Sequence, residues 1–133
     1  MKKYSEDHQW VEVKKGVATV GITPYAAEEL GEVSFVELPE EGTVVTQGDP
    51  LCVVESVKAA SDVFAPISGT VAEVNQALDE TPAMINDSPE RDGWICRLKE
   101  IDESELSELM TEAEYEHYVS GTEEEEEEEE DEP

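Results

Sequence analysis

The sequence has very few positive charges for its length. Its 133 residues include 8 Lys and Arg against 36 Asp and Glu, which gives a formal net charge of −28. Nucleic-acid binding depends on Lys and Arg contacts with phosphates, so this composition argues against a nucleic-acid partner. The same excess of acids argues against binding to anionic membrane surfaces.

Long apolar runs and catalytic motifs are also missing. No apolar run is long enough to cross a bilayer, and the first eight residues carry acids without an apolar core. The two histidines, His8 and His117, lie far apart, and no nucleophile, phosphate-binding or metal-ligand motif is present. We therefore expect a non-catalytic protein without a metal site, in the bacterial cytoplasm rather than the mitochondrial matrix.

Cysteine is scarce too. Cys52 and Cys96 are the two cysteines of the sequence, and at this separation they form no metal or redox motif. The default expectation is a reducing compartment in which both thiols are free and buried.

Apolar and acidic residues divide the chain into two parts. Residues 1–121 carry enough apolar residues for one domain with a modest core. Residues 122–133 include ten consecutive acids and nothing to bury, which predicts a disordered, solvated tail. The functional alternatives are a docking tail for a basic partner and a segment that binds cations non-specifically.

Alternating apolar residues and turn signals predict a mostly β domain. Residues 9–22 are typical of a hairpin. Thr23 and Pro24 then suit the cap and first position of a helix over residues 24–30, which Gly31 ends. In residues 32–38, strict alternation places Val33, Phe35 and Glu37 on one face.

The second half of the domain is predicted to add shorter elements. The pattern indicates a strand at 71–74, a loop with a helical turn over 75–86, and a last strand at 94–98. In that last strand Trp94, Cys96 and Leu98 share a face. Helical spacing from residue 102 includes Met110, and a capping box at Thr111 opens a second helix. Gly-Thr-Val occurs at 42–44 and again at 69–71, which suggests two strand units related by a pseudo-twofold axis in a flattened barrel.

A single lysine, Lys58, lies between two Val-rich segments in residues 53–64. These segments predict a hairpin whose turn is formed by residues 57–59. A lysine in a turn is usually a plain solubilising residue. Here turn signals at 48–50 and 65–69 also bracket the hairpin, and small neighbours leave the amine open to a modifying enzyme. We therefore interpret Lys58 as a covalent attachment site for a cofactor arm.

Residues 55–62 resemble the lipoylation motif of the glycine cleavage system H-protein family. The resemblance extends over about residues 4–118 and includes these further segments: His8-Gln9-Trp10-Val11, Val20-Gly21-Ile22-Thr23, Leu30-Gly31, Val36-Glu37-Leu38-Pro39, Ala65-Pro66, Ser68-Gly69, Val74-Asn75, Ile85-Asn86, Gly93-Trp94 and Glu114-Tyr115.

The resemblance implies a barrel-sandwich hybrid fold of the lipoyl-domain type, with two small antiparallel sheets, a short helix in the N-terminal half and C-terminal helices. It implies that Lys58 carries lipoic acid in amide linkage. The residues around the lysine would be recognised by modifying enzymes and partners: Glu55, Ser56, Val57, Ala59, Ala60, Ser61 and Asp62.

The family's role is that of a carrier in glycine catabolism and one-carbon metabolism. It implies a monomer that shuttles an aminomethyl group from glycine decarboxylase to aminomethyltransferase. Reducing equivalents pass to dihydrolipoyl dehydrogenase, and lipoylating enzymes install the cofactor. The alternatives are an H-like protein that relays lipoyl groups to 2-oxoacid dehydrogenase complexes, and an unmodified interaction module. A biotin carrier is disfavoured because Val57 and Ala59, rather than Met, flank the lysine.

One position departs from the family pattern. The family usually has Glu between the His and the Trp, where this sequence has Gln9. The resemblance implies an arm-docking cleft at His8, Gln9 and Trp10, in which that acid helps to hold the aminated arm. Glutamine cannot pair with a cation, so we expect weaker protection of the loaded arm.

Overall fold

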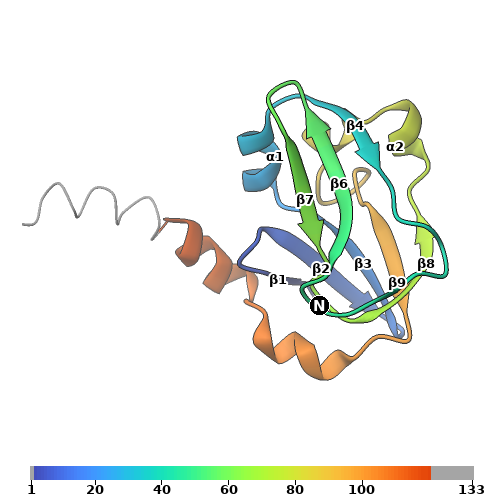
Figure 1. Cartoon of the computed structure of the whole chain (residues 1–133). Coiled ribbons are helices and arrows are strands. Elements are labelled where there is room, and N and C mark those ends of the chain that lie inside the picture. The colour runs from blue at the N-terminus through green and yellow to red at the C-terminus, as the bar shows by residue number, and fades with distance from the viewer. Residues whose placement is uncertain (1, 121–133) are drawn as a thin grey trace, which may run out of the picture.

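The computed structural model describes residues 2–120. Figure 1 shows a mostly β molecule with short helices around its strands. The strands are β1 Lys2–Tyr4, β2 Gln9–Lys14, β3 Val17–Ile22, β4 Val33–Glu37, β5 Val44–Val45, β6 Pro50–Ser56, β7 Ala60–Phe64, β8 Gly69–Val74 and β9 Cys96–Lys99. The helices are α1 Pro24–Leu30, α2 Ala77–Glu80, α3 Met84–Asp87, the 3₁₀ helix η1 Glu103–Glu108 and a helical segment over residues 112–120.

The strands form two antiparallel sheets, as predicted. The larger sheet has six strands in the order β1-β2-β3-β9-β8-β5, and the smaller has three in the order β4-β6-β7. Both sheets contribute to one apolar core, which includes Val11, Val20, Val36, Val54, Val63, Val71 and Leu98. The smaller sheet contains the β6–β7 hairpin. The stability of this hairpin therefore depends on the same core as the rest of the fold.

The predicted local elements of the N-terminal half are present. β2 and β3 pair in the register Lys14 with Val17 and Gln9 with Ile22. The Thr23 hydroxyl accepts a hydrogen bond from the Ala26 N–H, and Pro24 begins α1. Gly31 ends the helix with φ 77°, a conformation that glycine adopts without a Cβ penalty.

The two Gly-Thr-Val segments are strand partners. Val44 pairs with Thr70 and Val45 with Gly69 in the antiparallel β5–β8 ladder. The Gly42 N–H donates to the Val71 carbonyl at 2.7 Å, and the Val71 N–H donates to the Thr43 carbonyl at 2.8 Å. An antiparallel pairing of equivalent segments supports the predicted pseudo-twofold relation between the two strand units.

Strict alternation in residues 32–38 was a wrong prediction. Val33 and Val36 are buried, at 2% and 1% exposure, whereas Phe35 is 48% exposed. The register with β6 shifts between Val33 and Phe35. This irregularity adds one residue between the two inward-facing valines, so Phe35 does not share a face with Val33.

Two predictions near the C-terminus were also inaccurate. The last strand begins at Cys96, and Trp94 packs with Tyr4 and Trp10 instead of lying on the face of Cys96 and Leu98. The first C-terminal helix is the 3₁₀ helix η1, and Met110 lies beyond it. Met110 forms an isolated antiparallel bridge with Tyr4, so tertiary pairing outweighs its helical spacing.

The capping box is confirmed. The Thr111 N–H donates to Glu114 Oε1 at 2.9 Å, and the Glu114 N–H donates to the Thr111 hydroxyl at 3.2 Å. The domain end at residue 121 and the acidic tail 122–133 lie outside the described residues and stay predictions.

Candidate functional site

Lys58 lies in the turn that joins β6 to β7. Ser56 closes this turn: its N–H donates to the Ala59 carbonyl at 2.8 Å. Its hydroxyl accepts from the N–H groups of Lys58 and Ala59, each at 3.2 Å. Backbone and side-chain bonds together fix the turn, so the backbone of Lys58 is held in place while the residue stays exposed.

The residues that flank the lysine differ in exposure. Glu55 and Ser56 are partly buried at the end of β6. Val57 is 74% exposed, and its N–H donates to the Glu32 carbonyl at 3.2 Å. The remaining members of the predicted recognition segment are exposed: Lys58, Ala59, Ala60, Ser61 and Asp62. The lysine and the residues that follow it in the hairpin are therefore open to solvent.

A cleft of 310 Å³ lies beside this hairpin. Its lining residues come mainly from α1, β7 and the turn before β2, and Figure 1 shows α1 and β7 next to each other. The lining residues are Asp7, His8, Gln9, Ile22, Tyr25, Ala26, Glu29, Leu30, Ser61, Asp62 and Val63. Apolar side chains and the carboxylates Asp7, Glu29 and Asp62 both contribute, so the cleft suits a short apolar chain that ends in a cation.

His8 joins the cleft to the C-terminal helical segment. Its Nδ1 lies 2.7 Å from the Tyr115 hydroxyl, which lies 2.7 Å from the Thr23 hydroxyl. His8 has φ 70°, and its ring contacts Tyr25 at a centroid distance of 4.7 Å. Burial lowers the pKa of His8 from its ordinary value of 6.5, against the opposing effect of Asp7 and Glu29. The folded protein therefore favours the neutral imidazole.

Gln9 uses its side-chain amide within its own turn. The Ser5 hydroxyl donates to Gln9 Oε1 at 2.6 Å, and Gln9 Nε2 donates to the Asp7 carbonyl at 3.0 Å. The residue is 2% exposed. Gln9 therefore forms part of the cleft wall and contributes no charge to it.

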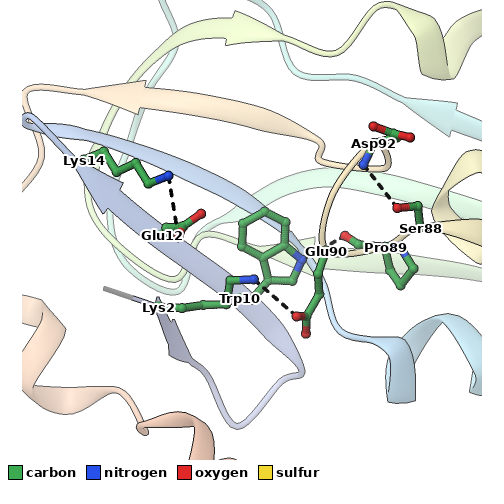
Figure 2. A network of polar contacts seen from close by, with 8 residues as sticks. All are labelled: Lys2, Trp10, Glu12, Lys14, Ser88, Pro89, Glu90 and Asp92. Carbon is green, nitrogen blue, oxygen red and sulfur yellow. Dashed lines mark hydrogen bonds and ion pairs between the residues drawn. The ribbon is translucent and has the colours of Figure 1, made fainter.

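Trp10 has a different environment from His8 and Gln9. Its ring packs against Gly21, where an added Cβ would lie 2.7 Å from the indole. Figure 2 shows the Trp10 N–H directed at the Pro89 carbonyl, a bond of 2.9 Å, with Lys2 nearby bonded to Glu90. Trp10 does not line the cleft, because successive side chains of a strand point to opposite faces. The cleft prediction therefore depends on His8 and Gln9.

The two cysteines are free and buried in the core, as expected. Burial raises the pKa of the Cys96 thiol to about 12 and also raises that of Cys52. Residues 2–120 contain no group of three or more His, Cys, Asp or Glu placed to hold a metal ion. Within the same range, the helices are all too short or too polar to span a membrane.

Several residues near the lysine were not predicted as functional. The cleft adds Asp7, Glu29 and Leu30, and Gly31 contacts the Lys58 side chain. The sequence indicates Gly31 as a helix stop and as part of the family resemblance, but not as a contact of Lys58. Asn86 is bonded to the segment that follows α1, but its partners lie 53 and 55 residues away in the chain. Local patterns carry no signal of such a contact.

Taken together, two antiparallel sheets and a hairpin that presents an exposed lysine define a barrel-sandwich fold of the lipoyl-domain type. Residues 2–122 match the family model described as "Glycine cleavage H-protein". The glycine cleavage system H protein of Dinoroseobacter shibae is 54% identical over 107 residues, which are 80% of this chain and 88% of that protein. The H protein of Thermotoga maritima is 48% identical over 120 residues, 90% of this chain and 97% of that protein.

A solved structure agrees with these sequence matches. The crystal structure of a glycine cleavage system H protein from Mycobacterium marinum superposes with a TM-score of 0.80 at 37% identity. The superposition covers 90% of this chain and 96% of the Mycobacterium marinum chain. The chain belongs to the glycine cleavage H-protein family.

Proposed function

We propose that this protein is the lipoyl-lysine carrier of a glycine cleavage system, with lipoic acid attached to Lys58. The observation that supports this most strongly is the exposed lysine on a turn fixed by Ser56, next to a cleft. The lipoyl group would supply a dithiolane whose sulfur can accept the aminomethyl group of glycine. The protein itself would be a monomeric, non-catalytic subunit.

The residues of the cleft fit such an arm. Ile22, Leu30 and Val63 offer apolar contacts for its hydrocarbon part. Asp7, Glu29 and Asp62 offer negative charge to a cationic group at its end. Lys58 lies three residues before Ser61, which lines the cleft, so the arm would start close to the cleft. Acylation also removes the charge of the lysine.

Three enzymes would act on the carrier in turn. Glycine decarboxylase would load it, aminomethyltransferase would unload it, and dihydrolipoyl dehydrogenase would reoxidise it. Segment 55–62 would present the lysine to these enzymes and to the lipoylating enzymes. A tethered arm keeps its reactive end at high local concentration near a docked enzyme, which is how a protein without catalytic residues serves several active sites.

The test is glycine-dependent exchange of labelled bicarbonate into glycine, measured with a purified glycine decarboxylase. The lipoylated protein should support exchange, and a Lys58→Arg variant should support none. Lys99→Arg removes a different exposed lysine and should behave like the wild type. Exchange that continues with Lys58→Arg would refute the assignment of the lysine. Transfer of the lipoyl group to a 2-oxoacid dehydrogenase lipoyl domain, without support of exchange, would indicate the relay function instead.

A further inference from the structure

The side chain of Lys58 rests against the glycine that ends α1. A β-carbon placed on Gly31 would lie 2.9 Å from Cε of Lys58 and 3.7 Å from its Nζ. The first distance is shorter than a carbon–carbon contact, so any other residue at position 31 would displace the lysine. Gly31 thus provides the surface on which the end of the lysine side chain lies.

The position of Gly31 also brings the end of that side chain close to the cleft. The preceding residues, Glu29 and Leu30, line the cleft beside the hairpin. A group attached to Nζ therefore begins next to the residues that form one wall of the cleft. The contact with Gly31 places the end of Lys58 near that wall of the cleft.

Asn86 of α3 holds the segment that contains Gly31. Its Nδ2 donates to the Gly31 carbonyl at 2.7 Å, and its Oδ1 accepts from the Val33 N–H at 2.9 Å. These two bonds bracket Glu32, whose carbonyl accepts the Val57 N–H at 3.2 Å. One amide side chain therefore connects α3 to the end of α1 and, through Glu32, to the turn that carries Lys58.

We propose that Gly31 and Asn86 are positioning residues that seat Lys58 for acylation and direct its arm into the cleft. The inference rests on the proposed function, in which Lys58 is the acylated residue. In that reaction the neutral lysine amine attacks the carbonyl carbon of a lipoyl adenylate. A C–N bond forms, the C–O bond to AMP breaks, and one proton leaves the nitrogen for solvent. Gly31 and Asn86 take no part in bond making and act only by placing the nitrogen.

The test compares Asn86→Ala with Asn75→Ala. Asn75 is a matched control because its side-chain amide also makes two hydrogen bonds with the backbone, here from Nδ2 to the carbonyls of Asp92 and Trp94, each at 2.8 Å, in a different loop. Acylation is measured by intact mass with a lipoate–protein ligase, lipoate and ATP. We expect Asn86→Ala to lower kcat by roughly tenfold to a hundredfold, the effect of a small misplacement of a reacting group. KM should change little, because Glu55 and Asp62 remain in place. Asn75→Ala should be acylated at the wild-type rate.

A second readout needs no acylation. Hydrogen exchange of the Val57 amide in the unmodified protein should be faster in Asn86→Ala than in Asn75→Ala, because the Glu32 carbonyl is no longer held. Asn86→Asp keeps the acceptor for Val33 and loses the donor to Gly31, so it should be intermediate. Gly31→Ala should slow acylation further, although strain at its positive φ also destabilises the fold.

The outcomes separate the two proposals. Equal kcat values for Asn86→Ala and the wild type, or equal slowing by Asn75→Ala, would overturn the positioning role while the carrier function stands. A wild-type protein that takes no lipoyl group would overturn the proposed function, and the inference with it.

Discussion

Residue 9 illustrates how one amide changes what a cleft can hold. Gln9 is bonded to Ser5 and to the Asp7 carbonyl, so it stabilises the turn without adding charge. The negative charge of the cleft comes from Asp7, Glu29 and Asp62. In the proposed function, a cationic arm would be attracted by side chains that are exposed to water, where ion pairs are weak.

We predict that Gln9→Glu slows the loss of the aminomethyl group from the loaded protein by roughly two- to fivefold, the effect of one additional weak ion pair. A glutamate keeps the acceptor for Ser5, loses the donor to Asp7, and adds a negative charge to the cleft wall. The measurement is a time course of intact mass after loading. Gln47→Glu makes the same change outside the cleft and should leave the rate unaltered. Equal rates for wild type and Gln9→Glu would contradict the prediction.

His8 makes a pH-dependent contribution to stability. Its pKa is lowered in the folded state, so the unfolded chain binds a proton at a higher pH than the folded protein. The contribution is complete above the unfolded value of 6.5, begins to fall below that value, and is lost as pH falls through the lower folded-state pKa.

We therefore expect His8→Asn to reduce the loss of unfolding free energy between about pH 7.5 and about pH 5.5. Asparagine tolerates the positive φ of this position. Urea denaturation at several pH values measures the difference between the two proteins. Every other titrating group is present in both proteins. If the difference in unfolding free energy between wild type and His8→Asn is the same at every pH in that interval, His8 does not cause the pH dependence.

At the scale of elements, α1 is the helix that forms one wall of the cleft. Thr23 is 0% exposed, and its hydroxyl serves both the Ala26 N–H and the Tyr115 hydroxyl. The Thr23 side chain thus caps α1 and also links α1 to the C-terminal helical segment through the Tyr115 hydroxyl.

Thr23→Val should lower the free energy of unfolding by roughly 1–3 kcal/mol, because the cap is lost and a buried hydroxyl of Tyr115 loses a partner. The exposed cap substitution Thr111→Val serves as the comparison and should cost about 0.5–1 kcal/mol. Chemical denaturation of both variants measures these values. If the buried substitution costs no more than the exposed one, the linking role of Thr23 is wrong.

Elements whose signals are local could be predicted from the sequence. The cap at Thr23, the stop at Gly31 and the turn at residues 57–59 each depend on a few neighbouring residues, and the structure contains all three. The irregular pairing of β4 with β6 could not be predicted from the sequence, because it depends on how two separate strands fit together. The same holds for Met110, whose partner Tyr4 lies at the other end of the chain.

The candidate site follows the same division. The lysine and its flanking residues form one continuous segment, so a single motif identifies them. The cleft is assembled from the turn before β2, from α1 and from β7, and neighbouring residues of β2 point in different directions. Trp10 was therefore grouped with His8 and Gln9 by sequence adjacency, although its side chain packs against Gly21.

At the scale of the whole molecule, the net charge of −28 would govern how the proposed partner enzymes approach. A strongly acidic surface attracts basic patches over a distance of about one Debye length, which is ~10 Å at 0.1 M salt. Such steering favours rapid, transient docking to several enzymes.

Binding to glycine decarboxylase should therefore weaken as ionic strength rises. Between about 50 mM and about 500 mM salt, we expect the KM of the decarboxylase for this protein to increase several-fold, with kcat changing little. The melting temperature of the protein over the same salt series controls for changes in folding. A KM that is constant across the titration would rule out electrostatic docking.

The central claim is that Lys58 carries the prosthetic group, and peptide-level mass spectrometry tests it most directly. The protein is produced with lipoate and a lipoate–protein ligase, digested, and searched for modified lysines. The account predicts one lipoyl group, on the peptide that contains Lys58, and none in Lys58→Arg. A wild-type protein that stays unmodified, or one modified at another lysine, would contradict it.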